Sequence, residues 1–417
     1  MRLLICGINY APELTGVGKY TGEMAEWFAA QGYDVRVVTA PPYYPGWQVG
    51  GGYQSWAYQR ERRADVEVFR CPLWVKRNPS GRERLIHLLS FALSSLPVMI
   101  QQIFWAPDLV LAVEPTFFSS PTALLVARLS GAQAWLHVQD LEMDAAFKLG
   151  LLPHRWWGGL SGVESWLKRQ FDWVSSISQP MVDRLLLKGL TPTKTLLFPN
   201  WVDTDQIYPL AQPCPLRQEL GLTPRDTVVL YAGNLGQKQG LEVLLEAACA
   251  LKSRPDLHFI LCGDGAARER LTGMAQALSL HNVRFMPLQP EHRLNDLLNL
   301  ADIHALIQKS ESADLVMPSK LTGMLASGRP ILATADAGTA VAEVMSRANC
   351  GAVVPPGDVA ALVAAIADLS TDGARRQALG MNGRVYAQRL LEKNWVLSRL
   401  RQSLERPLPQ TAIKVQS

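Results

Sequence analysis

The sequence has few cysteines and no arrangement of them that binds a metal. Its six cysteines are scattered along 417 residues, and no two form the Cys-x-x-Cys spacing that is typical of structural zinc sites. Two of them lie inside apolar runs, so we expect reduced thiols in the core of a cytoplasmic protein rather than disulfides. The six are Cys6, Cys71, Cys214, Cys249, Cys262 and Cys350.

A large excess of charge of one sign is also lacking. The chain carries 41 lysines and arginines against 37 aspartates and glutamates, a formal net charge of +4 at pH 7. This excess is too small for a dedicated nucleic-acid-binding protein, although a pI near 8.7 suits an anionic ligand or membrane surface. The 48% hydrophobic and 19% charged residues are typical of a well-packed enzyme, and the length predicts two to three domains of roughly 150 residues each.

Long hydrophobic runs are lacking as well. The opening MRLLICGINY has only a few apolar residues before polar ones begin, so we expect no signal peptide and a protein that stays inside the cell. The most lipophilic segment, Arg82 to Trp105, contains His87 and Pro97 and falls short of the roughly 20 strongly apolar residues that span a bilayer. Cations flank it, so it is either a helix in a membrane interface or a helix that covers the protein's own sheet. The tryptophan-rich segment 154–173 allows the same two interpretations.

Short apolar runs alternate with helix-length segments in both halves of the chain. Runs that are apolar throughout are typical of parallel strands buried on both faces. The pattern therefore predicts two α/β domains with doubly wound parallel sheets, joined by a proline-rich segment near residue 210. The predicted strands are 2–8, 34–40, 66–72, 108–114, 132–140 and 173–178 in the first domain, and 227–233, 257–265, 282–287, 303–308, 330–334 and 351–358 in the second.

Glycine-rich turns follow several of these strands. The first strand leads into GINYAPELTGVGKY, where Gly16 and Gly18 precede a predicted helix and can bring backbone N–H groups up to an anion. The dinucleotide fingerprint is not met, because Lys19, Tyr20 and Thr21 follow and no acidic residue ends the second strand, so we expect no nicotinamide cofactor. YAGNLGQKQGLEVLLEAA, ILCGDGAARERLTGMA and MPSKLTGMLASGRPILATA predict three more anion-binding turns, although each alone could be a tight turn that needs glycine.

These blocks, with FPNWVDTDQIYP and NVRFMPLQPEHRLNDLLNLADIHALI, resemble the retaining glycosyltransferases of family 4 over nearly the whole chain. Within the family, GINYAPELTGVGKYTGEMAEW and VTAPPYYPGWQVG are most similar to colanic acid biosynthesis enzymes of the WcaI type. The resemblance implies a GT-B fold of two Rossmann-like domains that face each other across a cleft. It implies an acceptor-binding domain at 1–208, a donor-binding domain at 209–390, and a last helix and tail at 391–417 that return to the first domain. It implies no metal and no other cofactor, since side chains and helix ends neutralise the leaving diphosphate.

The same resemblance assigns the residues that bind the nucleotide-sugar donor. Thr15 and Gly16 would approach its diphosphate, and Gly263, Asp264 and Gly265 would shape the nucleotide pocket. The remaining assignments are Asn234, Gly240, Asp314 and Ser319 as further donor contacts, and Lys238 with Lys320 as the catalytic cations.

Three positions depart from the family pattern. An arginine is common where this chain has Asn234, and the lysine expected just before the glycine of that turn is replaced by Gln239, with Lys238 one place earlier. The usual pair of glutamates is absent, since Gly323 stands at the second position and Asp314 is one of two nearby acids. We therefore expect diphosphate binding to depend on the two lysines, and no residue is assigned to the ribose.

The stretch HVQDLEMD, at the end of a predicted strand, is where we expect the acceptor chemistry. A carboxylate there could accept a hydrogen bond from the acceptor hydroxyl or stabilise positive charge on the sugar, and Asp140 is favoured. His137, Gln139 and Glu142 are further acceptor-side candidates, and Gln139 corresponds to a histidine often found in the family. His137 could instead be satisfied inside the fold, and Glu142 could be a solvated residue at a helix start.

Together these observations predict a retaining glycosyltransferase bound peripherally to the inner face of the cell membrane. It would move a sugar from a nucleotide sugar to a polyprenyl-diphosphate-linked saccharide during exopolysaccharide assembly, and similar enzymes imply GDP-fucose as the donor. The resemblance alone implies that the leaving diphosphate would assist attack on the same face of the sugar. Two alternatives stay open: a nucleotide-sugar 2-epimerase of the same fold, and a donor-binding subunit without catalysis, which the absent glutamate pair favours.

Overall fold

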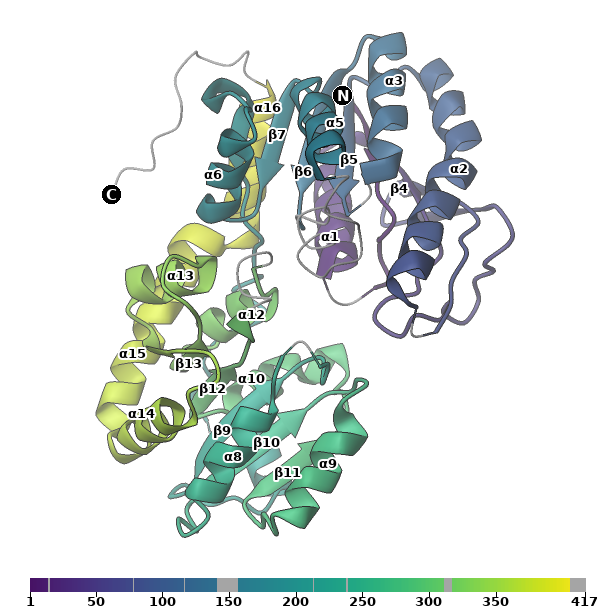
Figure 1. Ribbon diagram of the computed structural model, residues 1–417. Helices are drawn as coiled ribbons and strands as arrows, with labels where there is room; N and C mark the ends of the chain where they lie inside the picture. Colours follow the sequence, from purple (N-terminus) through teal and green to yellow (C-terminus); the bar gives the residue numbers. More distant parts are fainter. Residues whose placement is uncertain are drawn as a thin grey trace. The chain divides into compact units, whose positions relative to one another are not determined.

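The computed structural model describes residues 1–13, 16–77, 79–115, 117–140, 157–212, 214–237, 239–310 and 317–405, with the side chains of all but residues 157–160 among them. The chain forms two compact units (Figure 1). Unit 1 consists of Met1–Pro199 and the chain from Arg399 onward, and unit 2 of Asn200–Ser398. The division at Pro199 precedes the proline-rich segment near residue 210 that the sequence indicated as the connection.

Unit 1 is built on an eight-stranded sheet in the order β3-β4-β2-β1-β5-β6-β7-β8. Its described strands pair in parallel, except that β3 and β4 pair antiparallel. The central strand LVLAVE is buried at every residue, as expected of a strand with helices on both faces. The strands are β1 (Arg2–Cys6), β2 (Asp34–Thr39), β3 (Gln59–Arg63), β4 (Val66–Arg70), β5 (Leu109–Glu114), β6 (Gln133–Val138), β7 (Trp173–Ser176) and β8 (Thr195–Leu197).

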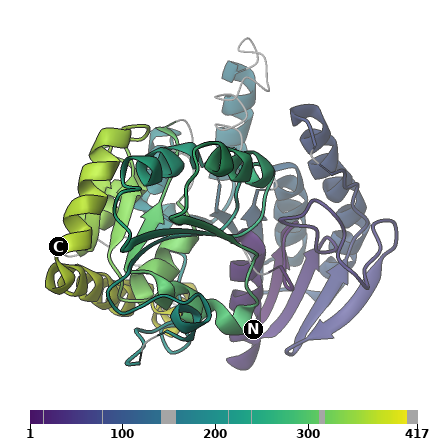
Figure 2. The same ribbon diagram turned by 90° about the horizontal axis from the view of Figure 1, so that it is seen from below.

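Helices cover both faces of this sheet. Two views show α1 on one face and α2, α3 and α5 on the other (Figures 1 and 2). The longest, α2, begins at a capping box in which Ser80 and Glu83 each accept a hydrogen bond from the other's backbone N–H, and it ends at Ala106 in the left-handed conformation (φ 52°). The helices are α1 (Gly16–Ala30), α2 (Gly81–Trp105), α3 (Ser120–Ser130), α5 (Trp157–Arg169) and α6 (Gln179–Leu187).

The last helix, α16 (Lys393–Glu405), contributes residues to both units. Its first residue, Lys393, forms an ion pair with Asp203 within unit 2 (Nζ to Oδ2, 2.5 Å). Its final turn belongs to unit 1, where the Tyr33 hydroxyl donates a hydrogen bond to the Glu405 carboxylate at 2.8 Å. The end of the described chain is therefore fastened to the unit in which the chain began.

Unit 2 holds a six-stranded sheet in the order β11-β10-β9-β12-β13-β14, and all of its strand pairs are parallel. On one side its core joins strand residues such as Phe259 and Leu332 to Leu245 of α8 and Ile366 of α14. The strands are β9 (Thr227–Ala232), β10 (Leu257–Cys262), β11 (Val283–Met286), β12 (Ile303–Leu306), β13 (Ile331–Thr334) and β14 (Gly351–Val354). The helices are α7 (Pro215–Glu219), α8 (Glu242–Ala250), α9 (Arg268–Ala277), α10 (Leu294–Leu300), α12 (Lys320–Ala326), α13 (Ala340–Ala348), α14 (Val359–Thr371) and α15 (Gly373–Tyr386).

The structure confirms the two parallel-sheet α/β domains and each of the twelve predicted strands. Two further strands of unit 1 were not predicted. β3 reads QRERR, and its outer, half-solvated position at the sheet edge needs no apolar run. β8 has only three residues, TLL, which is too short for a pattern to show. All six cysteines are free thiols, as expected.

Each sheet has one switch point, a pair of neighbouring strands whose following connections run to opposite sides of the pair. In unit 1 this point lies between β1 and β5, and in unit 2 it lies between β9 and β12. The loops that follow such a pair of strands diverge and leave a crevice at the carboxyl ends of the strands, where ligands of this fold class bind. The stretch GINYAPELTGVGKY begins directly after β1 and ends in the first turns of α1, and the turn after β9 starts at Gly233, so both glycine-rich stretches lie at switch points.

A buried ion network holds α5 against the carboxyl end of β5. Lys168 of α5 is 1% exposed, and its Nζ lies 3.1 Å from Glu114 Oε2 and 2.9 Å from Glu164 Oε1. Lys188 pairs with the second Glu164 oxygen at 2.9 Å. Burial raises the pKa of the Glu114 carboxyl, and the charge of Lys168 opposes that rise. Two cations thus balance two buried carboxylates, and each depends on the others to remain charged.

Lys168→Met should therefore destabilise the protein strongly, by about 3–5 kcal/mol, because it leaves two buried carboxylates to share one lysine. Chemical denaturation of wild type and variant gives the difference in free energy of unfolding. Lys252→Met is the control, since Lys252 is exposed and its loss should change stability by no more than about 0.5 kcal/mol. A loss below about 1 kcal/mol for Lys168→Met would show that the network contributes little.

Candidate active site

Two glycine turns interlock at the carboxyl edge of the unit 2 sheet. Leu235 N–H donates to the Asp264 carbonyl at 2.8 Å, and Ala267 N–H donates to the Leu235 carbonyl at 2.8 Å. This brings the turn after β9 against the turn after β10. A Cβ on Gly263 would lie 1.9 Å from the Gly233 carbonyl oxygen, and one on Gly265 would lie 2.4 Å from Asn234 Oδ1. Both glycines also have positive φ, 147° and 152°, so only glycine allows the two backbones to approach this closely.

Lys320 reaches this place from the start of α12. Its Nζ donates a hydrogen bond to the Tyr231 hydroxyl at 2.7 Å and lies 4.0 Å from the centre of the Tyr231 ring. The Tyr231 hydroxyl in turn donates to the Asn234 carbonyl at 2.7 Å. A Cβ on Gly233 would be 2.9 Å from the ammonium, so the glycine makes the space into which Lys320 extends.

The ammonium of Lys320 is enclosed, although the residue as a whole is half-buried. Burial lowers the pKa of Lys320 to about 7. Within the described ranges, no carboxylate forms an ion pair with it, and its partner Tyr231 is a neutral phenol whose own pKa burial raises. An anion that binds beside Lys320 would therefore favour the charged, ammonium form of this lysine.

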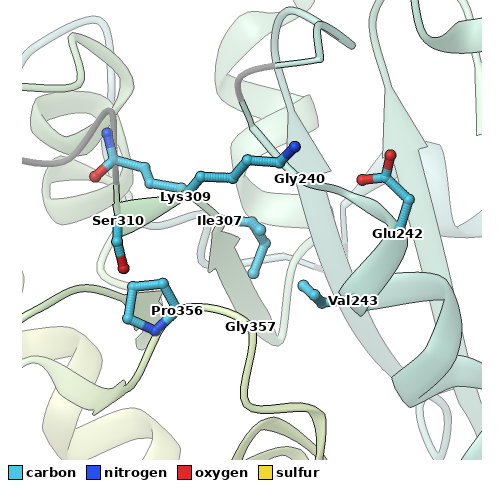
Figure 3. Close-up of a pocket in the computed structure, with 9 residues that line it drawn as sticks. Gly240, Glu242, Val243, Ile307, Lys309, Ser310, Pro356 and Gly357 are labelled. Carbon is cyan, nitrogen blue, oxygen red and sulfur yellow. The ribbon is translucent and has the colours of Figure 1, made fainter. Parts of the chain in front are cut away.

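A second lysine, Lys309, follows β12 and lies across the same switch point. Its Cγ is 2.8 Å from the position a Cβ on Gly240 would occupy, and Gly240 has a φ of 68°. Figure 3 shows the side chain extended across a cavity of about 350 Å³ toward Gly240, with Glu242 on the far side. The cavity is also lined by Gln308, whose buried Oε1 has no hydrogen-bond partner within the described part of the chain. It thus offers a cation and an unused acceptor to a polar ligand.

The structure brings most of the predicted donor residues of unit 2 to this edge. Asn234, Gly263 and Gly265 meet in the interlocked turns, and the Asp264 side chain accepts a hydrogen bond from Gly265 N–H at 2.9 Å. Lys320 contacts the same turn. Gly240 borders the neighbouring cavity, and Ser319 is exposed immediately before α12. Lys238 and Asp314 lie outside the described residues.

In unit 1, Glu13 fastens the glycine-rich loop after β1. Its carboxylate is 5% exposed and accepts hydrogen bonds from the backbone N–H groups of Tyr43 (3.0 Å) and Tyr44 (2.9 Å) and from the Asn9 side chain (2.9 Å). A Cβ on Gly18 would lie 2.4 Å from Glu13 Oε2. Burial raises the pKa of Glu13, and these donors oppose that rise. Gly18 is therefore needed so that the carboxylate can tie this loop to the loop after β2.

Three residues that the sequence predicted for the site lie near Glu13 or follow β6. Gly16 is the first residue of α1, and Gln139 and Asp140 come directly after β6. Gly16 has a φ of 63° and its Cβ position is 3.7 Å from the Tyr44 ring, so the turn packs on that tyrosine. Burial raises the pKa of Tyr44, and the charges of Asp140 and Glu13 raise it further while Arg84 lowers it. Asp140 therefore lies close enough to Tyr44 for their charges to interact. Its neighbour Gln139 is buried. Thr15 and Glu142 lie outside the described residues.

His137 lies inside the sheet. It is 1% exposed, its Nδ1 is 2.8 Å from the Ser175 hydroxyl, and its ring packs against Trp135 and Phe198. Burial lowers its pKa to about 3, so the imidazole is neutral at physiological pH. We therefore leave His137 out of the proposed acceptor site.

Sequence reasoning missed several residues of the site. Tyr231 looks like a core residue because it lies in the apolar run TVVLYA, and its contact with Lys320 joins positions 89 residues apart. Lys309 follows a strand without any glycine or motif beside it, and only its position at the switch point reveals it. Tyr44 and Glu13 meet through backbone donors, which no side-chain pattern reports.

Comparison with known proteins agrees with this architecture. The model of the family "Glycosyl transferases group 1" matches residues 215–386, and that of the family "Glycosyl transferase 4-like domain" matches residues 15–201. The chain therefore belongs to the GT-B glycosyltransferases of family 4, and is of the WcaI type. It is 44% identical over 409 residues to the "Putative colanic acid biosynthesis glycosyl transferase WcaI" of Escherichia coli K12, covering 95% of this chain and 98% of that one.

Solved structures share the fold at low sequence identity. Sucrose-phosphate synthase from Thermosynechococcus elongatus superposes with a TM-score of 0.74 at 18% identity and covers 97% of this chain and 98% of its own. Anabaena HepE in complex with UDP-glucose gives 0.71 at 16% identity, with 97% and 99% covered. These structures support the GT-B fold, and the family establishes that the chain is a glycosyltransferase.

Gly265→Ala should abolish the interlock of the two turns, because the new Cβ would overlap Asn234 and the residue would need a backbone conformation unfavourable by about 1–3 kcal/mol. We expect the affinity for GDP or UDP to fall at least tenfold, which corresponds to about 1.4 kcal/mol. Isothermal titration calorimetry measures it. The control is Gly273→Ala in α9, where no atom beyond the adjoining backbone of the helix lies within 4 Å of the new Cβ. The control should keep nucleotide affinity, and equal affinities for both variants would contradict the assigned turn.

Proposed function

We propose that this glycosyltransferase moves a sugar, with retention of its anomeric configuration, from a nucleotide sugar to a polyprenyl-diphosphate-linked saccharide. The pathway would be the assembly of an exopolysaccharide similar to colanic acid, and GDP-fucose is the best candidate donor. The similarity to WcaI over 95% of the chain supports the pathway, and the acceptor and donor identities rest on the family resemblance. A lipid-linked acceptor would place the enzyme at the inner face of the cell membrane.

The Lys320 ammonium is the observation that carries the proposal. A buried cation is unfavourable unless a counter-charge accompanies it, and within the described chain Lys320 has a neutral phenol instead. It lies at the switch point of unit 2 beside backbone turns shaped by Gly233, Gly263 and Gly265. A nucleotide diphosphate bound there would supply the missing negative charge. Lys309, whose side chain lies against Gly240, would add a second cation.

The same arrangement suggests how bond cleavage is assisted. Negative charge grows on the diphosphate as it leaves the sugar, and preorganised cations stabilise that charge most in the transition state. We propose that lysines do this without a metal or other cofactor. The cavity beside Lys309 would hold part of the donor, since its size is within the range of small-molecule sites. Gln308 Oε1, which has no partner in the described part of the chain, would accept a hydrogen bond from a hydroxyl of the ligand.

On the acceptor side we propose Asp140 as the group that accepts the hydrogen bond of the attacking hydroxyl. It follows β6 at the carboxyl edge of the unit 1 sheet, and its charge acts on Tyr44, which is 39% exposed. Tyr44 is held by Glu13 and packs on Gly16. A retaining enzyme whose leaving group assists attack needs no nucleophile of its own. One enzyme carboxylate that accepts a hydrogen bond from the acceptor hydroxyl is therefore sufficient.

A panel of nucleotide sugars tests the function. The purified enzyme is incubated with each donor, GDP-fucose included, and with polyprenyl-diphosphate-linked glucose, and the lipid is analysed by mass spectrometry. We expect a gain of one sugar with one donor, and a turnover lower by about 10²–10³ in Lys320→Met because one stabilising group is lost. Isomerised donor without lipid product would indicate the 2-epimerase. Nucleotide binding with neither product would indicate a non-catalytic subunit and overturn the proposal.

Lys320 also predicts that nucleotide binding takes up a proton above neutral pH. In the free enzyme the pKa of Lys320 is about 7, and a bound diphosphate must raise that pKa because it favours the ammonium. Below pH 7 the lysine is already charged, whereas between pH 7 and the pKa of the complex each binding event must add a proton. The affinity should therefore be highest below pH 7 and fall as the pH rises.

Calorimetry with GDP or UDP at about pH 8, in two buffers that differ in ionisation enthalpy, measures this uptake. The terminal phosphate, with a second pKa near 6, is already ionised there, so the proton goes to the protein. We expect uptake of about one proton in the wild type and none in Lys320→Met. Equal uptake by both proteins would assign the proton to another group.

A further inference from the structure

We infer that the outer side of α2, together with the adjoining side of α3, is the surface by which this enzyme docks on an anionic lipid bilayer. The inference deepens the proposed function, since it rests on a lipid-linked acceptor and names the surface that meets the membrane. It is carried by three observations on unit 1: an exposed apolar stripe, a long interval without charge, and a cluster of cations at one end.

The apolar stripe runs the length of α2. Successive members are separated by three, four, seven and four residues, so they project from one side of the helix. The side chain of Leu93 is 70% exposed and that of Phe104 is 89% exposed. On a helix that only covers its own sheet, large apolar side chains face the sheet and polar ones face water. We call this set the α2 stripe, and its members are Ile86 (50%), Leu89 (42%), Leu93, Ile100 (41%) and Phe104.

The other side of α2 is packed into unit 1. Phe91 and Met99 are fully buried, and Gln102 donates to the Val98 carbonyl and accepts from Arg36 on β2. By length and composition α2 is the one described helix that could cross a membrane. A helix fixed to a sheet along one side cannot be surrounded by lipid, however, so α2 suits a position in the plane of the interface.

Charge is absent along the stripe. Between Arg84 and Asp108 the chain has no Asp, Glu, Lys or Arg, and burial lowers the pKa of His87, which keeps that ring neutral. A water-facing helix normally carries charged residues on its outer side. The neighbouring α3 continues the apolar surface with Leu125 (46% exposed) and Leu129 (61%), and both views place α3 beside α2 on the same face of the sheet (Figures 1 and 2).

Cations gather where the stripe begins. The segment 76–84 contains four cations against one acid, Glu83, which gives it a net charge of +3. Lys76 pairs with Glu83, while Arg77, Arg82 and Arg84 are exposed. A stripe of apolar side chains with arginines at its edge matches the two layers of an anionic bilayer, acyl chains below and phosphate groups above. A protein partner would not require this combination, and we therefore commit to a lipid surface.

The docking surface begins beside the acceptor site. Arg84 lies in the first turn of α2, with its guanidinium 5.5 Å from the centre of the Trp47 ring. Its charge acts on Tyr44, as does the charge of Asp140. An acceptor anchored by its lipid in the same membrane would therefore have its saccharide near Asp140 without leaving the bilayer.

Vesicle sedimentation with the full-length enzyme tests the inference. We expect binding to vesicles of phosphatidylglycerol and phosphatidylethanolamine, and at least tenfold weaker binding to phosphatidylcholine alone. The double variant Leu93→Ser with Phe104→Ser should bind the anionic vesicles at least tenfold more weakly than wild type. Both residues are largely exposed, so the fold should be kept, which thermal unfolding checks. The matched control is Leu288→Ser in unit 2, where a leucine is 65% exposed outside the surface, and its binding should equal that of wild type.

A second variant separates the apolar and the electrostatic contributions. Arg82→Glu should reduce the preference for anionic over neutral vesicles several-fold and make binding less sensitive to salt, while the stripe remains. Unchanged vesicle binding in the double variant would overturn the inference. So would a wild-type dimer in analytical ultracentrifugation that becomes monomeric in the double variant, since a second copy would then cover the stripe.

These measurements need neither donor nor acceptor, so their outcome does not depend on whether the proposed function is correct. Vesicle binding by an enzyme that transfers no sugar would overturn the function and keep the docking surface. Sugar transfer in detergent by an enzyme that does not bind vesicles would support the function and overturn the docking surface.

Discussion

Parallel strands all end at the same edge of a sheet, and this constraint determines where the candidate active site lies. Among the strands that the structure describes, every pair in unit 2 is parallel, and in unit 1 only β3 runs against its neighbour. Buried parallel strands have to be apolar along their length, so polar groups are placed in the turns beyond their ends. The Glu13 clasp, Asp140, the interlocked glycine turns and Lys320 all follow from that arrangement.

Within unit 2 the glycines and Lys320 depend on one another. Gly233 leaves the space that the ammonium enters, and Gly263 lies so close to Gly233 that a methyl group would meet its carbonyl oxygen. The ammonium contacts a tyrosine whose hydroxyl bonds to the backbone of Asn234. The turns therefore enclose a lysine whose pKa is lowered by burial. The departure at Gly323 fits close packing against α10, since a Cβ at position 323 would lie 3.3 Å from the Leu298 side chain, which would have to shift slightly to make room for it.

The sequence was sufficient for the parts of the fold that local pattern controls. Continuous apolar runs predicted twelve strands, and glycine-rich turns after them predicted Asn234, Gly263 and Gly265 at one edge. It was insufficient where an interaction joins distant residues or an edge strand carries charge. QRERR gives no strand signal because β3 needs no apolar face at the sheet margin, and the pairing of Tyr231 with Lys320 depends on how β9 and α12 come together. For His137 the sequence suggested a site residue that the fold buries, since only packing distinguishes a buried histidine from one that faces a ligand.

The charged edge of the unit 1 sheet has a consequence for the membrane association that we propose. An edge strand exposes unpaired backbone groups to which another copy of the protein can add a strand. β3 presents three arginines there, and Arg62 and Arg63 pair with acids of their own unit. Copies of a protein that are confined to a surface encounter one another far more often than copies dispersed in solution. An edge that carries its own ions would keep such crowded copies from joining their sheets, so the enzyme could bind the proposed membrane surface at high density without forming aggregates.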